Sequence, residues 1–446
     1  MKIPLSPPPL TGLLQKIKDF EKVLGCGPLV GGRYLHWDQL RHRTPPADLN
    51  HEAWWAGVKL ARQSLLKGLP LVDKHGRPIQ FAVPDPVHRA LHRIDIQAAG
   101  SVAMPAPLVS ADERDRYLVS SLIEEAITSS QLEGASTTQA VAKDMLRSGR
   151  APRDRSEQMI LNNFHAMQAV RELKDDPLTP ERILEIHRIV VEDTLDDPGA
   201  AGRLRKPGEN VNVMDAQHST VLHDPPDAES LPQRLQHLCD FANGRLDSEP
   251  FVHPVIRAIL LHFMLGYDHP FVDGNGRAAR ALFYWRMARS GYWLMEYVSI
   301  SRLLRNAPAR YARAFLFTET DHNDATYFLI HQLDVIEQAI QALHDYLARK
   351  TREQAVAETL LRQSPRLSGR LNHRQVALLS HALRHADHGY TVESHRRSHQ
   401  ITPQTARTDL LGLVDLGLLE KSKRGRAFVF YALKDLRARV EQAAGA

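Results

Sequence analysis

Apolar residues recur with helical spacing through the middle of this 446-residue chain. Three segments carry the amphipathic pattern, at 114–130, 156–173 and 179–195. The stretch "PVIRAILLHFMLGYDH" (254–269) is apolar nearly all round, which predicts a central, buried helix. Residues 277–292 follow after a short loop, and we expect them to form a helix that packs against the buried one. The pattern therefore predicts a mainly α protein.

Two stretches depart from the helical pattern. Residues 69–84 hold two short apolar runs around a turn and predict a small hairpin. Residues 210–226 alternate valines with turn-forming residues and predict a second short hairpin on the surface of the helical domain. Before both, residues 51–68 predict a helix whose Trp54 and Trp55 pack in a core.

These patterns divide the chain into four parts. Residues 1–112 form a mixed, mostly helical region, and residues 113–350 form the main helical domain, with a first helix near 114–134. Residues 351–369 are interpreted as a linker, and residues 370–446 as a C-terminal domain. A chain of this length has room for two or three domains.

Composition narrows the class of protein. Hydrophobic residues make up 43% of the chain and charged residues 24%, which is ordinary for a globular protein. No stretch approaches the roughly 18 apolar residues that a membrane helix needs, and the start lacks an apolar signal core, so we expect a cytoplasmic protein without membrane partners. Cys26 and Cys239 match no metal or redox spacing and are interpreted as reduced thiols.

The net charge of +5 is unevenly distributed. Residues 361–446 hold 15 Lys and Arg against 7 Asp and Glu, a balance of +8, which leaves 42 against 45, or −3, for the rest. This excess is typical of a nucleic-acid-binding face on a terminal module. A merely solvated basic surface explains the same count.

The stretch "HPFVDGNGRAAR" (269–280) concentrates side chains suited to phosphate chemistry. The Gly-Asn-Gly turn at the start of a helix offers backbone N–H groups to an anion. Arg277 and Arg280 share a helix face, and two guanidinium groups beside such a turn suit a polyphosphate. Asp273 offers an oxygen ligand for Mg²⁺, and His269 a base. In isolation, the glycines could form only a turn and His269 could only cap a helix.

This stretch resembles the Fic family signature, His-Pro-Phe-x-Asp/Glu-Gly-Asn-Gly-Arg-x-x-Arg, and matches it at every fixed position. The similarity extends over roughly residues 113–345. The resemblance implies an all-helical domain that transfers AMP from ATP to a hydroxyl side chain of a target protein. Related proteins with other donors transfer UMP, phosphate or phosphocholine.

The resemblance also implies roles for individual residues. His269 would take the proton from the target hydroxyl, and Asp273 would hold Mg²⁺ against the phosphates. Phe271 would be a core anchor. The remaining residues would contact ATP: Gly274, Asn275 and Gly276 around the phosphates, Arg277 at the leaving pyrophosphate, Arg280 at the γ-phosphate and Tyr311 near the adenine.

A second short motif, "SSQLEG", ends the helix near 114–134. It is similar to the inhibitory helix found upstream of the catalytic motif in one class of Fic proteins, with Ser129, Glu133 and Gly134 in register. The resemblance implies that Glu133 pairs with Arg280 and displaces the γ-phosphate. The alternative is that Glu133 and Gly134 only end a helix, with Gly134 as the residue after the cap.

The predicted hairpin at 210–223 corresponds to the "flap" with which Fic proteins pair a target as an added strand. A plain surface hairpin is the alternative.

The C-terminal region resembles a winged helix-turn-helix. Residues 374–383 would form its first helix, and Thr402-Pro403 begins a helix that ends at Gly417, followed by a basic turn and an alternating strand. The resemblance implies DNA contacts from Gln404, Thr405 and Arg407. Protein contacts or formation of a homodimer are the alternative uses of such a domain.

Together these features predict an autoinhibited protein adenylyltransferase that uses ATP and Mg²⁺. The alternative function is a DNA-binding regulator that senses nucleotide through the Fic site.

Overall fold

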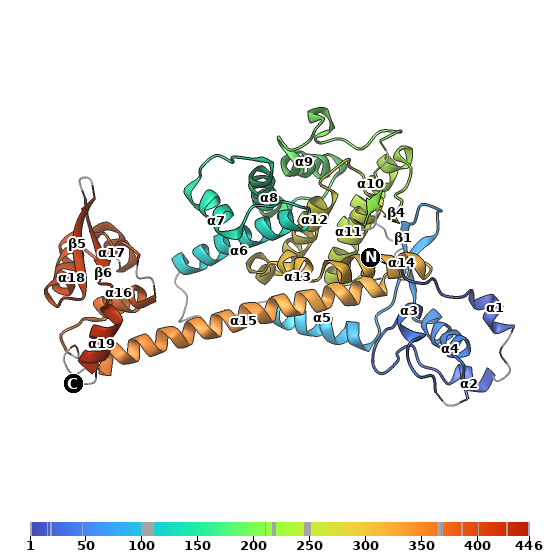
Figure 1. Ribbon diagram of the computed structural model, residues 1–446, viewed down its shortest axis with the longest axis horizontal. Helices are drawn as coiled ribbons and strands as arrows, with labels where there is room; N and C mark the ends of the chain where they lie inside the picture. Colours follow the sequence, from blue (N-terminus) through green and yellow to red (C-terminus); the bar gives the residue numbers. More distant parts are fainter. Residues whose placement is uncertain are drawn as a thin grey trace. The chain divides into compact units, whose positions relative to one another are not determined.

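The computed structural model describes the chain except residues 1, 16, 18–19, 47, 100–110, 210, 216–219, 245–250, 364–366, 368, 385–386, 400, 425–426 and 445–446. It divides into two compact units, Met1–Ala342 and Leu343–Ala446. Helices dominate both units and the three sheets have two strands each, so the prediction of a mainly α protein is confirmed (Figure 1). Among the described residues, no helix is long and apolar enough to cross a membrane.

The described residues before α6 (Ala111–Leu132) form helices and one small hairpin. Its elements are α1 (Leu10–Leu14), α2 (Phe20–Leu24), α3 (Trp37–Leu40), α4 (His51–Gln63), β1 (Lys67–Val72), β2 (Pro78–Phe81) and α5 (Asp85–Ala98). Strands β1 and β2 form the expected antiparallel hairpin. Trp54 and Trp55 of α4 are buried in a core with Leu35 and Leu40, which confirms their predicted packing role.

Buried polar contacts join this region to the end of the main bundle. Arg62 of α4 donates to the hydroxyl of Tyr327, and Lys59 lies 2.9 Å from the carboxylate of Asp321. The backbone of Gln80 in β2 pairs with the loop before α15, through Asn323 and Ala325. Because these groups are buried and paired, residues 1–98 are an integral part of the first unit.

The main bundle contains helices at the five places predicted between 113 and 350, together with others that were not predicted. They are α6 (Ala111–Leu132), α7 (Gln139–Ser148), α8 (Arg155–Glu172), α9 (Pro180–Val191), α10 (Leu231–Asn243), α11 (Pro254–Asp268), α12 (Asn275–Arg289), α13 (Ile300–Asn306), α14 (Pro308–Thr320) and α15 (Thr326–Gln363). The five predicted places are those of α6, α8, α9, α11 and α12. Short 3₁₀ turns lie at Leu173–Asp175, Pro198–Ala200, Ala228–Ser230 and Trp293–Tyr297. Figure 1 shows α11 and α12 in the middle of this bundle, where they pack against one another.

The apolar α11 is central and buried, as its sequence predicts. Every residue from Val255 to Leu265 is buried. The helix begins at Pro254, at the first helical position, where a missing N–H costs nothing. The loop that joins α11 to α12 therefore starts from a rigid core element.

The predicted hairpin lies beside this loop as β3 (Val213–Met214) and β4 (Val221–His223), which pair antiparallel. Residues 210 and 216–219 of the predicted 210–223 flap lie outside the described residues.

The second unit holds α16 (His373–Arg384), α17 (Val392–His399), α18 (Pro403–Asp415), β5 (Leu419–Arg424), β6 (Ala427–Ala432) and α19 (Leu436–Ala444). Thr402 caps α18 and Gly417 follows its end with φ +66°, as predicted. The linker expected at 351–369 is instead helical up to Gln363, as the continuation of α15. The reason is compositional, because residues 351–363 hold strong helix formers and neither glycine nor proline.

Candidate active site

The site is centred on the loop between α11 and α12. His269 is the residue that ends α11, in a left-handed conformation with φ +44°. Its Nδ1 lies 3.2 Å from the carbonyl oxygen of Gly266, which can only accept a hydrogen bond. The proton is therefore on Nδ1, and Nε2 is left with a lone pair. Burial lowers the pKa of His269, and the Gly266 carbonyl only partly opposes this, so the ring is a neutral base.

Arg205 fixes the backbone that carries this base. Its Nε donates to the carbonyl of His269 at 3.0 Å, and its backbone N–H donates to the carbonyl of Pro270 at 2.9 Å. The same guanidinium also donates to the carbonyl of Pro226, beyond β4. Nothing local in the sequence marks Arg205 as a site residue, because Arg203 and Lys206 beside it carry the same charge.

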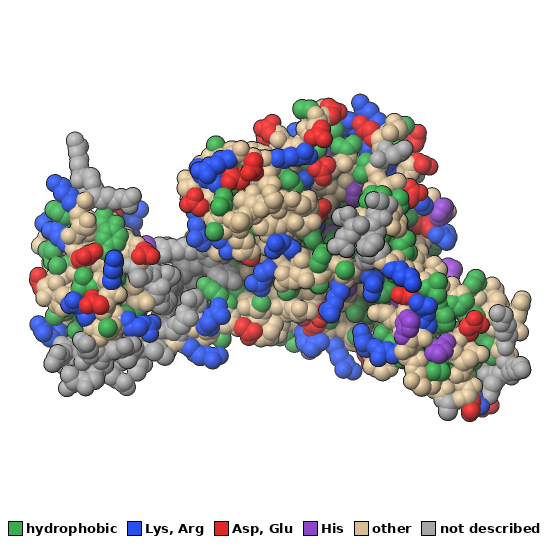
Figure 2. Space-filling view, viewed as in Figure 1, with side chains coloured by type: hydrophobic (Ala, Val, Ile, Leu, Met, Phe, Trp, Pro, Cys, Tyr) green, Lys and Arg blue, Asp and Glu red, His purple; other side chains and the backbone are tan. Residues whose placement is uncertain are grey.

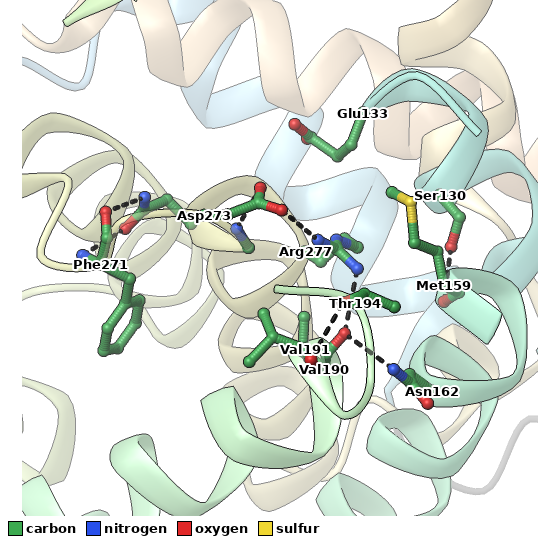
Figure 3. Close-up of polar contacts among 12 residues, drawn as sticks. Ser130, Glu133, Met159, Asn162, Val190, Val191, Thr194, Phe271, Asp273 and Arg277 are labelled. Carbon is green, nitrogen blue, oxygen red and sulfur yellow. Dashed lines mark hydrogen bonds and ion pairs between the residues drawn. The ribbon is translucent and has the colours of Figure 1, made fainter. Parts of the chain in front are cut away.

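The loop is braced from within by Asn275. Its Nδ2 donates to the carbonyl of Phe271 at 2.8 Å, and its Oδ1 accepts the N–H of Phe271 at 2.9 Å (Figure 3). The Phe271 ring is fully buried, which confirms its role as a core anchor. The side chain of Asn275 thus holds the loop in shape, and its backbone lies at the start of α12.

His187 of α9 supports the same loop, although the sequence did not mark it as a site residue. Its ring stacks on Phe271 with centroids 3.7 Å apart. Its Nδ1 accepts the N–H of Gly202 at 3.1 Å, so Nε2 donates to the carbonyl of Asp273 at 3.0 Å. Burial lowers the pKa of His187 to about 4, which keeps the ring neutral. The sequence feature that could have indicated His187 is a histidine among the apolar residues on one face of a helix.

Gly274 and Gly276 allow close approach for different reasons. Gly274 caps α12 with φ +81°, and an added Cβ would lie 2.7 Å from Val191. Gly276 has an ordinary φ, but an added Cβ would collide with the carboxylate of Glu133 and lie 3.0 Å from a nitrogen of Arg280. The structure therefore places a carboxylate against the first turn of α12, where helix N–H groups favour anions.

Asp273 and Arg277 lie side by side at the start of α12 (Figure 3). One oxygen of Asp273 accepts the N–H of Gly274 at 2.6 Å, and the other lies 3.4 Å from Arg277. Arg277 is fully buried and also donates to the carbonyl of Val190 at 3.0 Å. The Asp273 side chain is 45% exposed and can still reach a ligand outside the loop.

Arg280 is held by the end of α6. Its Nε donates to the hydroxyl of Ser129 at 2.8 Å, and a terminal nitrogen donates to the carbonyl of Ser129 at 3.1 Å. That terminal nitrogen also lies 2.8 Å from the carboxylate of Glu133. Gly134 follows with φ +98°, so Glu133 both ends the helix and reaches Arg280. The helix end and the predicted pairing with Arg280 are therefore both present, and inhibition by Glu133 stays a prediction.

Two of the buried guanidinium nitrogens without a hydrogen-bond partner among the described residues lie in this site: Nε of Arg277 and the second terminal nitrogen of Arg280. Unsatisfied buried donors are costly, so such groups in a folded protein call for an explanation. Both belong to the two arginines expected to bind phosphates. An anionic ligand at the start of α12 would satisfy them.

Glu125, one turn before Ser129 on α6, was also missed. Its buried carboxylate accepts hydrogen bonds from the hydroxyls of Tyr284 (2.9 Å) and Ser299 (2.7 Å) and from the backbone and hydroxyl of Ser301. These donors belong to α12 and to the start of α13. The network fixes the position of α6 along α12, which brings Ser129 to Arg280.

Tyr311 of α14 lies near Arg280. Burial raises the pKa of Tyr311 to about 12, although the positive charge of Arg280 acts in the opposite direction. Its hydroxyl lies 2.7 Å from Nε2 of the buried His262. A contact with adenine stays a prediction.

In the C-terminal unit, Gln404 and Arg407 are exposed on α18, whereas Thr405 is partly buried. The N–H of Thr405 donates to the capping hydroxyl of Thr402 at 3.2 Å. Thr405 thus takes part in the helix cap, and two of the three residues predicted to contact DNA are exposed.

A Mg²⁺ ion would have one protein ligand here. No group of three or more histidine, cysteine or acidic side chains suited to a metal lies within the part of the chain that the structure describes. The half-exposed Asp273 fits the role predicted for it, because Mg²⁺ commonly takes one or two carboxylates and completes its shell with phosphates and water.

Comparisons with known proteins agree with this geometry. Residues 177–287 match the Fic/DOC family. The protein adenylyltransferase Fic of Nematostella vectensis is 37% identical over 120 residues, which are 27% of this chain and 25% of that protein. The protein adenylyltransferase fic-1 of Caenorhabditis elegans is 34% identical over 117 residues, 26% of this chain and 20% of that protein. The matches thus span a quarter or less of the length of these curated relatives.

The fold has a similar solved structure. The crystal structure of a Fic family protein from Desulfovibrio desulfuricans G20 superposes with a TM-score of 0.51 at 18% sequence identity, over 79% of this chain and 96% of that chain. The similarity at this identity concerns the fold alone. The chain therefore has a mainly helical fold like that of a Fic family protein and, in residues 177–287, a segment that matches the Fic/DOC family.

Proposed function

We propose that this protein is an adenylyltransferase that transfers AMP from ATP to a serine, threonine or tyrosine hydroxyl of a target protein. The observation that carries the proposal is the position of a neutral base, His269, on the loop that leads to two arginines with unsatisfied buried N–H groups. A base beside an anion site is the arrangement that hydroxyl attack on a phosphate requires.

In the proposed reaction, Nε2 of His269 takes the hydroxyl proton as the target oxygen forms a bond to the α-phosphorus. The bond from that phosphorus to the bridging oxygen breaks, and pyrophosphate leaves. Arg277 would bind the leaving pyrophosphate, and Arg280 the γ-phosphate, with the backbone at Gly274 and Gly276 around the phosphates. A Mg²⁺ ion bound by Asp273 would neutralise phosphate charge. Positioning and charge neutralisation would supply most of the rate.

Glu133 would hold this site inactive. Its carboxylate pairs with Arg280 and lies against Gly276, so it occupies the place that a γ-phosphate would need. The pair is buried on the arginine side and 31% exposed on the glutamate side. Such a partly desolvated pair is stronger than a surface salt bridge but can still be displaced.

The test is mass spectrometry of the Glu133→Gly protein after incubation with ATP, Mg²⁺ and cell lysate. We expect covalent AMP on a hydroxyl side chain of a lysate protein or of the chain itself. The matched control is Glu133→Gly combined with His269→Ala, which should show none. Absence of AMP in the first sample, or equal AMP in both, would contradict the proposal.

A second candidate activity is DNA binding by the C-terminal unit. It is favoured by the exposure of Gln404, Arg407 and Thr408 along one side of α18, whose other side is buried through Ala406 and Leu410. Figure 2 shows basic and acidic side chains interspersed on one face of this unit, so the candidate rests on α18 rather than on charge alone. The test is duplex DNA binding at several salt concentrations, where binding should weaken as salt rises. No binding at low salt would exclude it.

A further inference from the structure

The base of the flap is attached to the bundle through His223, the last residue of β4. Its Nδ1 lies 2.7 Å from a carboxylate oxygen of Glu319 on α14, and its Nε2 lies 2.6 Å from the carbonyl oxygen of Tyr267 on α11. The His223 side chain is 7% exposed. This short strand is therefore connected through one side chain to two helices of the core.

Both ring nitrogens of His223 carry a proton in this arrangement. A carbonyl oxygen and a carboxylate oxygen can only accept, so each ring nitrogen must donate. Burial alone would lower the pKa of His223. The hydrogen bonds to the Glu319 carboxylate and the Tyr267 carbonyl have the larger effect, so the pKa of His223 is raised. The contact is thus a charge-assisted pair of hydrogen bonds, which are stronger than neutral ones.

The same end of the flap has a second, weaker attachment. Lys74, in the turn between β1 and β2, donates from Nζ to the carbonyl (3.0 Å) and carboxylate (2.7 Å) of Asp224. Its backbone N–H donates to the hydroxyl of Tyr267 at 3.1 Å. The Asp224 side chain is 67% exposed, so solvent screens this pair. Lys74 also opposes the charge on His223.

Tyr267 lies in the last turn of α11, two residues before His269. His223 therefore attaches the flap to the same helix end that carries the proposed base. The charge of His223 in turn lowers the pKa of His269.

We propose that His223 and Glu319 form a flap clamp, in which His223 is a positioning residue that holds β4 at a fixed place beside His269. A target segment added to the flap would then present its hydroxyl to Nε2. The positioning of a target rests on the proposed adenylyl transfer, whereas the clamp itself does not.

The clamp should respond to pH in a defined direction. The pKa of His223 is raised above its ordinary value of 6.5, so the clamp is fully present below about pH 6.5 and is lost as the pH rises through the folded-state pKa. The titratable and charged groups that interact with His223 are Glu319 on α14, Lys74 on the β1–β2 turn, Asp224 next to His223 in the chain, and Asp268 and the neutral His269 at the end of α11.

Hydrogen–deuterium exchange of the full chain tests the clamp without any assay of activity. The experiment compares wild type, His223→Gln, Glu319→Gln and Lys74→Met at about pH 6 and pH 9. The exchange rates are corrected for intrinsic exchange, and α11 serves as the internal reference. Exchange in residues 220–224 should rise about tenfold or more in His223→Gln and Glu319→Gln at pH 6, because charge-assisted hydrogen bonds are lost. Lys74→Met should change it by less than about threefold.

In wild type, exchange of the same residues should accelerate from pH 6 to pH 9, and in His223→Gln it should not. Unchanged protection in both clamp variants, or no pH response in wild type, would overturn the proposal. Glu319→Gln keeps the His223 ring in place, so the test does not depend on one variant folding.

Activity supplies the second readout. In a Glu133→Gly background, His223→Gln should raise the KM for the protein acceptor and leave the KM for ATP unchanged. Equal changes in both would mean that His223 acts only on general stability. If exchange changes as expected but no variant transfers AMP, the clamp stands and the proposed function fails.

Discussion

The carboxylate of Glu133 lies 2.8 Å from Arg280 and against Gly276, although Glu133 comes from the end of α6 and both partners belong to α12. One side chain thus contacts both the arginine and the glycine to which the proposed function assigns the phosphates of ATP. Contact with the glycine distinguishes this arrangement from a simple surface ion pair.

Removal of Glu133 should change the affinity for ATP more than that for ADP. In Glu133→Gly, Arg280 becomes free for a terminal phosphate, so we expect ATP to bind about tenfold more tightly than to wild type. Affinity for ADP should change by less than about threefold, because ADP lacks the phosphate in question. Isothermal titration calorimetry measures both. Replacement of the exposed Glu185 by glutamine is the control for removing a negative charge. An equal gain for both nucleotides would mean that Glu133 blocks another part of the site.

Replacement of Gly276 by alanine should abolish nucleotide binding without unfolding the protein, because the added Cβ would stand beside Arg280, where the proposed function places the phosphates, even after Glu133 has moved away. The added Cβ would meet the carboxylate of Glu133, whose flexible side chain can turn into solvent. Since Gly276 has an ordinary φ within a helix, we expect thermal stability within about 1 kcal/mol of wild type. The decisive variant is Gly276→Ala combined with Glu133→Gly. Restored ATP binding in this double variant would show that Gly276 serves only to accommodate Glu133.

Asn275 should matter for stability as well as for the site. Asn275→Ala leaves the buried N–H and carbonyl of Phe271 without their partners, at a cost of about 2–4 kcal/mol for the two groups together. Asn275→Asp keeps the acceptor and should cost less. Urea unfolding measures both free energies. A stable Asn275→Ala protein that fails to bind ATP would instead assign the side chain directly to the nucleotide.

Acid should destabilise the first unit through its buried neutral histidines. Burial lowers the pKa of His36 and His187 to about 4 and that of His262 to about 3. For groups whose pKa falls on folding, the unfolded chain binds more protons, so stability is complete above about pH 6.5 and falls as the pH falls toward 4. At pH 5 the expected loss is about 2 kcal/mol for each of these residues.

Urea unfolding between pH 7 and pH 5 checks this expectation. In His262→Phe, the free energy of unfolding should fall less between pH 7 and pH 5, by the amount that one histidine contributes. His223 has the opposite sign, since its pKa is raised and its contribution is retained in acid. A flat wild-type curve would mean that these rings become protonated in place.

The sequence predicted the elements whose pattern is local. The apolar length of α11, the glycines of the following loop and the cap at Thr402 all act within a few residues, so periodicity and spacing identify them. The position of His269 at a helix end and the burial of Phe271 follow from the same local signals.

The residues that the sequence analysis missed act across the fold. Arg205, His187 and Glu125 each bind backbone or hydroxyl groups of a distant segment, and no spacing along the chain announces such a contact. The hairpin that carries His223 was predicted, but the role of His223 was not. That role depends on its contact with Glu319, which lies on the distant helix α14. The continuation of α15 to Gln363 was missed because a polar segment before a proline resembles a linker.

The contact between Glu133 and Arg280 joins two parts of one polypeptide, so dilution cannot separate its partners. A tethered group meets its partner at an effective concentration on the order of millimolar. The fraction of molecules in which the contact is closed is therefore the same in a cell with few copies of the protein as in a cell with many. Under the proposed inhibition by Glu133, higher expression would add more inactive molecules. Release would then require a ligand, a modification or a movement of α6 that acts on each molecule separately.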